Sequence, residues 1–142
     1  MKKDDSLPKL EASISLDVSV FLADLTYTQQ TIASDVMPAA IGGLAEYAES
    51  VVKFKTPIKL FKFPEKLIAA LEDEGFPDFI GFSNYIWNSG LSLSFARAIK
   101  KLSPKTIIVC GGPNYPLGLA EQEAFLRKHP EVDFFIPKEG EI

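Results

Sequence analysis

The fold class of this chain follows from residues 106–116, TIIVCGGPNYP. The first half is a β-branched, apolar run without polar alternation, which is typical of a strand buried on both faces. Such strands belong to parallel sheets that are covered by helices. Gly111 and Gly112 follow at the carboxyl end of the strand, where open α/β sheets bind their ligands. Because glycine lets a large ligand lie against the backbone, the stretch favours a cofactor platform.

Strand and helix patterns alternate along the rest of the chain. Apolar or alternating runs predict strands at residues 16–23, 57–63, 78–83, 106–112 and 132–136. Amphipathic runs between them predict helices at residues 37–48, 64–75, 91–102 and 119–128. This alternation predicts an α/β fold, a flavodoxin-like (Rossmann-like) three-layer sandwich whose five-stranded parallel sheet has the order 2-1-3-4-5.

Composition indicates one globular domain and excludes several classes of function. The chain has 142 residues, about the length of one domain, with 46% hydrophobic and 24% charged residues. The net charge of −4 gives no basic footprint for a nucleic-acid partner. No apolar run is long enough for a membrane span. Because the charged start lacks the apolar core of a signal peptide, we expect a cytoplasmic protein with a flexible N-terminus (1–15) and one domain (16–142).

Cysteine and histidine are each present once, as Cys110 and His129. Neither a disulfide nor a cluster of soft metal ligands can therefore be formed within the chain. Cys110 ends an apolar run, so we expect a small buried residue. His129 has no neighbouring ligands, and we expect it at the surface.

Three loops are predicted to meet at the carboxyl edge of the sheet, at residues 24–31, 83–88 and 111–115. They contain hydroxyls, amides, glycines and aromatic side chains, but no carboxylate pair and no nucleophile with a base. Acid–base and nucleophilic catalysis need such pairs. The loops therefore favour a binding site over a catalytic one. Its aromatic residues either wall a large planar ligand or pack at the base of the loops: Tyr85, Trp87 and Tyr115.

The run IGFSNYIWN at residues 80–88, the loop GGPNYP at 111–116 and the terminal VDFFIPKEGE carry a family resemblance. From about Val18 to its end, the chain resembles the N-terminal cobalamin-binding domain of radical S-adenosylmethionine (SAM) proteins. The resemblance implies that the chain is the N-terminal fragment of a longer protein. Its partner is then the radical SAM barrel of the same protein, which holds the [4Fe-4S] cluster and S-adenosylmethionine. One cysteine cannot hold that cluster, so this fragment alone is not expected to be catalytic.

The resemblance also implies which residues bind cobalamin. In the wider cobalamin-binding fold, Asp-x-His-x-x-Gly follows the first strand, serine the third and Gly-Gly the fourth. Asp24, Ser83 and the pair Gly111–Gly112 match, whereas Thr26 takes the histidine position and Gln29 the glycine position. The resemblance thus implies base-off cobalamin without a histidine ligand, assisting methyl transfer or radical chemistry in the missing domain. The predicted cofactor-binding residues are Asp24, Thr26, Tyr27, Ser83, Asn84, Tyr85, Gly111, Gly112, Pro113 and Asn114.

Other functions of the same fold stay open at this stage. If the domain has lost cobalamin, the alternative function is that of a non-catalytic docking module. An FMN-binding, flavodoxin-like module is suggested by the hydroxyls of Thr26, Thr28 and Thr31, but their loop lacks the glycine of a tight phosphate turn. A phosphoacceptor receiver domain needs an aspartate after the third strand, where this chain has Ser83 and Asn84.

Overall fold

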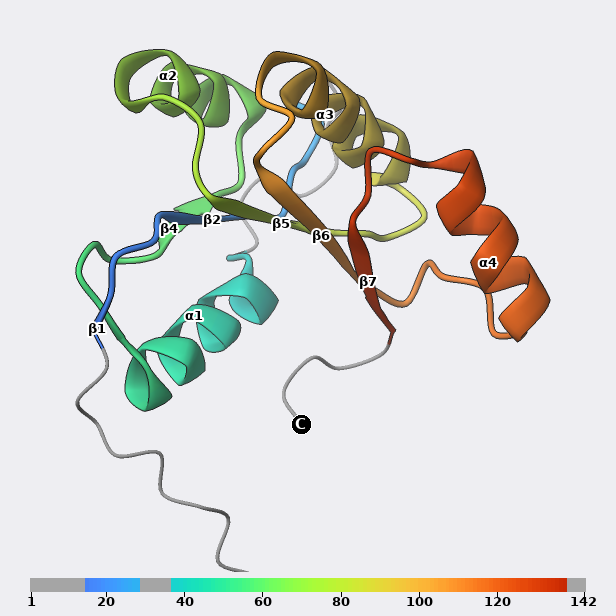
Figure 1. The fold of residues 1–142 in the computed structure, drawn as a ribbon, viewed down its shortest axis with the longest axis horizontal. Coiled ribbons are helices and arrows are strands. Elements are labelled where there is room, and N and C mark those ends of the chain that lie inside the picture. Colours follow the sequence, from blue (N-terminus) through green and yellow to red (C-terminus); the bar gives the residue numbers. More distant parts are fainter. Residues whose placement is uncertain (1–14, 29–36, 138–142) are drawn as a thin grey trace, which may run out of the picture.

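A computed structural model describes residues 15–28 and 37–137 of the chain. Its main sheet is parallel, with the strand order β4-β2-β5-β6-β7 (Figure 1). Counted along the chain, these five strands have the order 2-1-3-4-5, and the predicted flavodoxin-like α/β class is confirmed. The strands are β2 (Val20–Ala23), β4 (Lys59–Phe61), β5 (Phe79–Ser83), β6 (Ile107–Gly112) and β7 (Phe134–Pro137).

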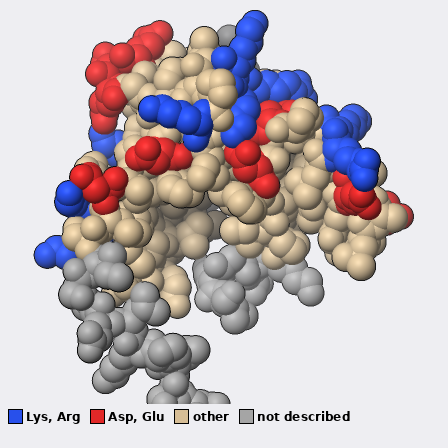
Figure 2. All heavy atoms as spheres, in the orientation of Figure 1, with Lys and Arg blue, Asp and Glu red and all other residues tan. Residues whose placement is uncertain are grey.

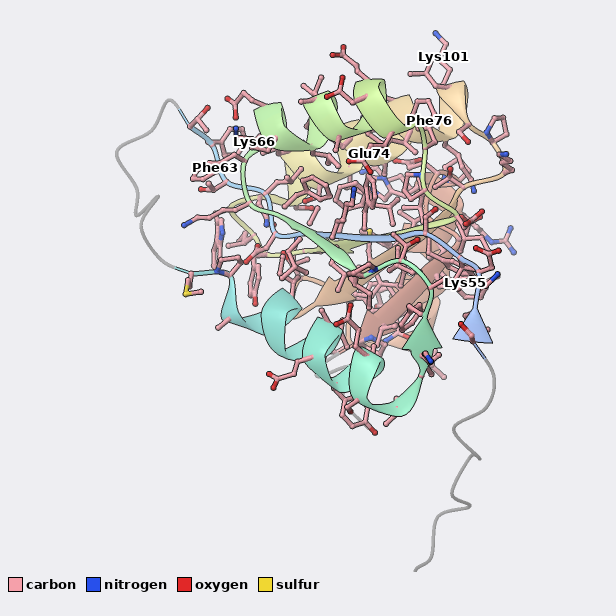
Figure 3. All side chains as sticks on the ribbon, turned by 90° about the vertical axis from the view of Figure 1, so that its left-hand side faces the viewer. Lys55, Phe63, Lys66, Glu74, Phe76 and Lys101 are labelled. Atoms are coloured by element: carbon pink, nitrogen blue, oxygen red, sulfur yellow. The ribbon has the colours of Figure 1, made fainter. Side chains whose placement is uncertain are left out.

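The helices cover the two faces of this sheet unequally. Figure 3 shows α1 (Ala39–Val51) on one side and α2 (Pro64–Glu74) with α3 (Ser89–Leu102) on the other. The fourth helix, α4 (Leu119–Lys128), lies beside β7 (Figure 1). Within residues 15–28 and 37–137, no helix combines the length and the apolar character that crossing a membrane requires.

The predicted strand at residues 16–23 is wrong in part, because two strands occupy this segment. β1 (Ser15–Leu16) pairs with β3 (Lys53–Phe54) in a separate two-stranded parallel sheet, and β2 starts only at Val20. Polar Ser19 causes the break: its hydroxyl and its backbone N–H both donate to the carboxylate of Asp78. Of the predicted flexible N-terminus, Ser15 lies in β1, and residues 1–14 lie outside the described part.

The main core lies between the sheet and the helices α2 and α3. Alternate side chains of β5 and β6 point into it, because successive residues of a strand face opposite sides. On the other face, a smaller buried cluster joins Leu22 of β2 to Ile41 and Ala45 of α1. The fully buried members of the main core include Ala23, Leu67, Ile80, Ala96, Ile108 and Cys110.

Cys110 is a buried structural residue, as predicted. Burial, with a smaller contribution from the nearby carboxylate of Glu131, raises the pKa of its thiol to about 12. A thiol with this pKa stays protonated at neutral pH and is a poor nucleophile and metal ligand.

His129 is buried, and the prediction of a surface histidine is wrong. It follows the last turn of α4, where its ring lies 4.6 Å from the ring of Phe125. Its Nδ1 is 3.2 Å from Oε1 of Glu131, and Nε of Arg97 donates to the same oxygen at 2.9 Å. Burial raises the pKa of Glu131, but hydrogen bonds from the backbone, His129 and Arg97 outweigh it and leave the pKa lowered.

The carboxyl end of β6 passes very close to the loop after β5. Gly112 has a φ of +122°, and a Cβ there would lie 2.9 Å from the carbonyl oxygen of Asn84. Only glycine fits this approach. Gly111 is different, because a Cβ there would meet its nearest atom, the carbonyl oxygen of Ile136, at an ordinary 3.7 Å.

We predict that Gly112→Ala lowers the free energy of unfolding by about 2 kcal/mol or more, through backbone strain and the clash with Asn84. Gly111→Ala is the matched control and should change it by less than about 0.5 kcal/mol. Urea unfolding of both variants measures the difference. Equal stabilities would contradict the close approach.

A second prediction concerns Asp78. Hydrogen bonds from the backbone N–H and then the hydroxyl of Ser19 hold the pKa of this carboxyl below its ordinary value. Folding therefore favours the ionised form, so the stabilisation is complete above the unfolded pKa of about 3.9 and is lost as the pH falls through the lower folded value.

Asp78→Asn should accordingly flatten the loss of stability on acidification, measured by urea unfolding between neutral pH and pH of about 3. Asp73→Asn, on the exposed surface of α2, is the control and should keep the wild-type profile. An unaltered profile in Asp78→Asn would rule out this role for the carboxylate.

Candidate functional site

Three loops meet at the carboxyl edge of the sheet, as predicted. They follow β2, β5 and β6, which are neighbours in the sheet. The register pairs Ala23 with Phe82 and Ser83 with Gly111, so the three loops start at nearly the same level. Residues that are far apart in the sequence are thus brought to one edge.

Asp24 is held by two side chains from the loop after β5. The hydroxyl of Ser83 donates to Oδ1 of Asp24 at 2.5 Å, and the amide of Asn88 donates to the same oxygen at 3.3 Å. The amide nitrogen of Asn88 also donates to the carbonyl of Leu25 at 3.2 Å, and its oxygen accepts the N–H of Tyr85 at 2.8 Å. The loops after β2 and β5 are therefore joined through one carboxylate.

Asn88 is a site residue that the sequence analysis missed. It is fully buried and precedes α3, but makes no side-chain capping hydrogen bond. An asparagine before a helix normally indicates an N-cap. Here the amide turns away from the helix, so only its position after IGFSNYIW marked it as part of the site.

Asn84 and Asn114 join the loops after β5 and β6. The N–H of Asn84 donates to the carbonyl of Gly111 at 2.6 Å, and the N–H of Asn114 donates to the carbonyl of Asn84 at 3.2 Å. The two side-chain amides face each other, and each donates to the other residue, at 3.3 and 3.4 Å. Asn84 is fully buried. The four hydrogen bonds tie the loops after β5 and β6 together.

Thr26 and Tyr27 lie in the loop after β2. The N–H of Thr26 donates to the carbonyl of Lys62 at 3.0 Å, which fixes this loop to the end of β4. Tyr27 is partly exposed, and its hydroxyl reaches the start of α3 beside Gly90. Thr28 donates to the carboxylate of Glu65 at 2.8 Å. Gln29 and Thr31 lie outside the described residues.

The aromatic residues divide between the two roles that the sequence left open. Tyr115 packs within the protein, stacked on Phe135 with ring centroids 3.8 Å apart. Tyr85 lines the cleft described below, and the ring of Trp87 stacks on it with centroids 4.4 Å apart. Trp87 itself is 63% exposed.

A cleft of about 700 Å³ runs between α1 and the sheet and opens at the carboxyl edge. This volume lies within the range of about 300–1,000 Å³ typical of small-molecule sites. In Figure 2 charged side chains lie at the top, right and left of the view, and the atoms visible around the hollow between α1 and the sheet are neither acidic nor basic. Five predicted site residues line the cleft, namely Ser83, Tyr85, Gly111, Gly112 and Pro113.

The described lining of the cleft is mostly apolar. Among residues 15–28 and 37–137, no group of three or more His, Cys, Asp or Glu side chains is placed to hold a metal ion. β5 ends on Ser83, where a receiver domain would carry its phosphoacceptor aspartate. The site is an apolar cleft with a polar mouth, suited to a large ligand with an apolar part.

The chain is similar to two curated methyltransferases, although no protein-family model matches it. It is 31% identical over 111 residues to 2-(S-pantetheinyl)-carbapenam-3-carboxylate methyltransferase of Streptantibioticus cattleyicolor, covering 74% of this chain and 15% of the relative. It is also 31% identical over 110 residues to the cobalamin-dependent radical SAM methyltransferase TokK of Streptomyces tokunonensis, covering 75% and 16%. The chain thus spans about 15% of the length of these relatives.

Solved structures share the fold. A cobalamin-binding protein from Desulfitobacterium hafniense aligns with a TM-score of 0.55 at 11% identity, over 84% of this chain and 52% of that one. The response regulator DrrB of Thermotoga maritima aligns with a TM-score of 0.54 at 17% identity, over 87% and 46%. At these identities the likeness concerns the fold alone.

Sequence and fold point the same way. The chain is homologous, over three quarters of its length, to part of cobalamin-dependent radical SAM methyltransferases, and its sequence and fold fit the cobalamin-binding domain of a radical SAM protein.

Proposed function

We propose that this chain binds cobalamin, with the nucleotide tail in the cleft between α1 and the sheet and the corrin ring over the loops at the carboxyl edge. The observation that carries the proposal is the cleft itself, about 700 Å³ in volume and open at this edge. Its place at the end of neighbouring parallel strands is where α/β folds bind cofactors.

The residues around the mouth fit such a ligand. Gly111 has no side chain, and a Cβ there would meet no atom nearer than 3.7 Å, so the backbone offers a surface for a bulky group. Ser83 and Tyr85, which carry hydroxyls, line the same cleft. When bound, cobalamin supplies a cobalt centre that carries a methyl group. The residues of this chain would orient the tail and exclude water from it.

The proposal includes base-off binding without a histidine ligand. Thr26 has no imidazole to offer from the loop after β2. His129 precedes β7, at the opposite edge of the sheet from the mouth of the cleft. Its Nδ1 lies within hydrogen-bonding distance of Oε1 of Glu131. The residues that the structure describes would then offer no imidazole to the cofactor.

The proposed partner is a radical SAM barrel with its [4Fe-4S] cluster and S-adenosylmethionine, in the remaining part of a longer protein. The small share of the relatives that this chain spans supports this partner. Three apolar side chains at the rim of the site are well exposed, Ile86 at 83%, Trp87 at 63% and Leu117 at 91%. This rim also supports the second candidate, a docking domain that does not bind cobalamin.

An FMN site fits the described loop poorly. A bound phosphate needs free backbone N–H groups. After β2, the N–H groups of Asp24 and Thr26 already donate to the carbonyls of Phe61 and Lys62.

Gly111→Leu should abolish retention of cobalamin, because the leucine side chain would fill the mouth of the cleft. The measurement is co-elution of hydroxocobalamin with the protein in gel filtration, followed by visible absorption. Gly43→Leu adds the same atoms on the exposed side of α1, where a Cβ would meet no atom within 4 Å, and should retain the cofactor.

Circular dichroism of both variants checks that the fold is intact. Cobalamin retained by Gly111→Leu at the wild-type level would overturn the placement of the ligand. No retention by the folded wild-type chain would favour the docking domain.

His129→Gln should leave the visible spectrum of bound cobalamin unchanged, because this residue lies away from the proposed cobalt position. Glutamine keeps a hydrogen-bonding group near Glu131, which limits the cost to the fold. If the wild-type chain gives the spectrum of imidazole-ligated cobalamin and His129→Gln loses it, histidine does bind the cobalt.

A further inference from the structure

Asn88 is fully buried, although the two residues before it, Ile86 and Trp87, are well exposed. The turn that contains them is closed at its base by backbone hydrogen bonds. The N–H groups of Asn88 and Ser89 both donate to the carbonyl of Tyr85, at 3.2 and 2.9 Å. The apex of this turn therefore projects from the carboxyl edge of the sheet, while its last residue faces inward.

The side-chain amide of Asn88 is matched to three partners. Its nitrogen donates to Oδ1 of Asp24 and to the carbonyl of Leu25, and its oxygen accepts the N–H of Tyr85. A carboxylate and a carbonyl only accept, and a backbone N–H only donates, so one orientation of the amide satisfies all three. Among side chains of this size, only asparagine supplies two N–H donors together with an acceptor.

The exposed apex of the turn needs such an anchor. The ring contact described for Trp87 is with Tyr85, which belongs to the same turn, so this contact does not fix the turn to the rest of the domain. At the end of the turn, the amide of Asn88 reaches across to the loop after β2. The place of the apex therefore depends on a buried side chain that lies behind it.

From these contacts we propose that Asn88 is a positioning residue of the cofactor site. It fixes the turn at residues 85–88 and so holds the stacked rings of Tyr85 and Trp87, of which Tyr85 lines the cleft. Because the amide ties this turn to the loop after β2, both loops are in place before a ligand arrives. Groups that are ordered in advance raise affinity, since binding does not have to order them. The inference rests on the proposed function, in which the ligand is cobalamin.

Asn88→Asp tests this role, because it replaces the donating nitrogen with an oxygen at nearly the same size. The new carboxylate would face Oδ1 of Asp24, which lies 3.3 Å from the nitrogen that it replaces. Two carboxylates this close repel, and one takes up a proton at mildly acidic pH, which restores a donor. Asp24 is the one titratable side chain hydrogen-bonded to Asn88 in the described part of the chain, and the other two partners are backbone groups.

The experiment measures Asn88→Asp in the 142-residue chain at pH of about 7.5 and of about 5. Its affinity for methylcobalamin, from absorption titration, should be at least about tenfold below that of the wild type at the higher pH and recover severalfold at the lower. The tryptophan bands of the near-ultraviolet circular dichroism spectrum come from Trp87 alone, because the sequence has one tryptophan. These bands should weaken and return in parallel, while the far-ultraviolet spectrum stays that of the folded chain.

Gln122→Glu is the matched control. It makes the same change from amide to acid in α4, where the amide donates to the carbonyl of Pro116 and not to a carboxylate. Both readouts should therefore stay at the wild-type level at both pH values. Asn88→Ser, which removes the amide without adding a charge, replaces Asn88→Asp if that variant does not fold, and its tryptophan bands should be weak at both pH values.

Wild-type affinity and wild-type tryptophan bands in folded Asn88→Asp at the higher pH would overturn the positioning role, as would wild-type bands in Asn88→Ser. A loss that acid does not reverse would overturn the part assigned to Asp24. If the wild-type chain binds no methylcobalamin, the proposed function fails, and the tryptophan bands still decide whether Asn88 positions the turn.

Discussion

A parallel sheet with apolar side chains on both faces must be covered on both faces, and in this domain the cover is unequal. The helices α2 and α3 close one face over a continuous core. On the other face α1 packs on β2 through Leu22, Ile41 and Ala45, while Phe134 and Ile136 of β7 stay 59% and 45% exposed. The cleft is the space that this imbalance leaves. Its lining is apolar because the strands carry apolar side chains on both faces.

The position of the mouth depends on close contacts between loops. β5 and β6 are paired from Phe79 to Ser83, so their loops begin side by side. Gly112 then lets the chain pass against the backbone of Asn84. The carboxylate of Asp24 joins the third loop through Ser83 and Asn88. These contacts fix the mouth without using its apolar surface, which remains available for a ligand.

The sequence predicted the parts of this molecule that depend on local patterns. The bounds of α2 follow from Pro64 and Gly75, and the main strands follow from apolar runs. The predicted strand over residues 16–23 failed, because the bonds of Ser19 to Asp78 depend on a residue far along the chain. His129 was misplaced for the same reason: its burial depends on tertiary contacts with Glu131 and Phe125. The five predicted site residues that line the cleft could be found because they lie at or just after strand ends. The direction of the Asn88 amide could not be predicted.

The reciprocal amides of Asn84 and Asn114 have a mechanical consequence. Two side-chain and two main-chain hydrogen bonds link the loops after β5 and β6, so neither loop can move without straining the other. Asn88 extends the same linkage to the start of α3 and to Asp24. The hydrogen bonds therefore connect the loop that contains Pro113 with the residue before α3, a helix on the far face of the sheet. Hydrogen bonds thus hold the three loops at the mouth of the cleft together, and displacing one loop would break bonds to the others.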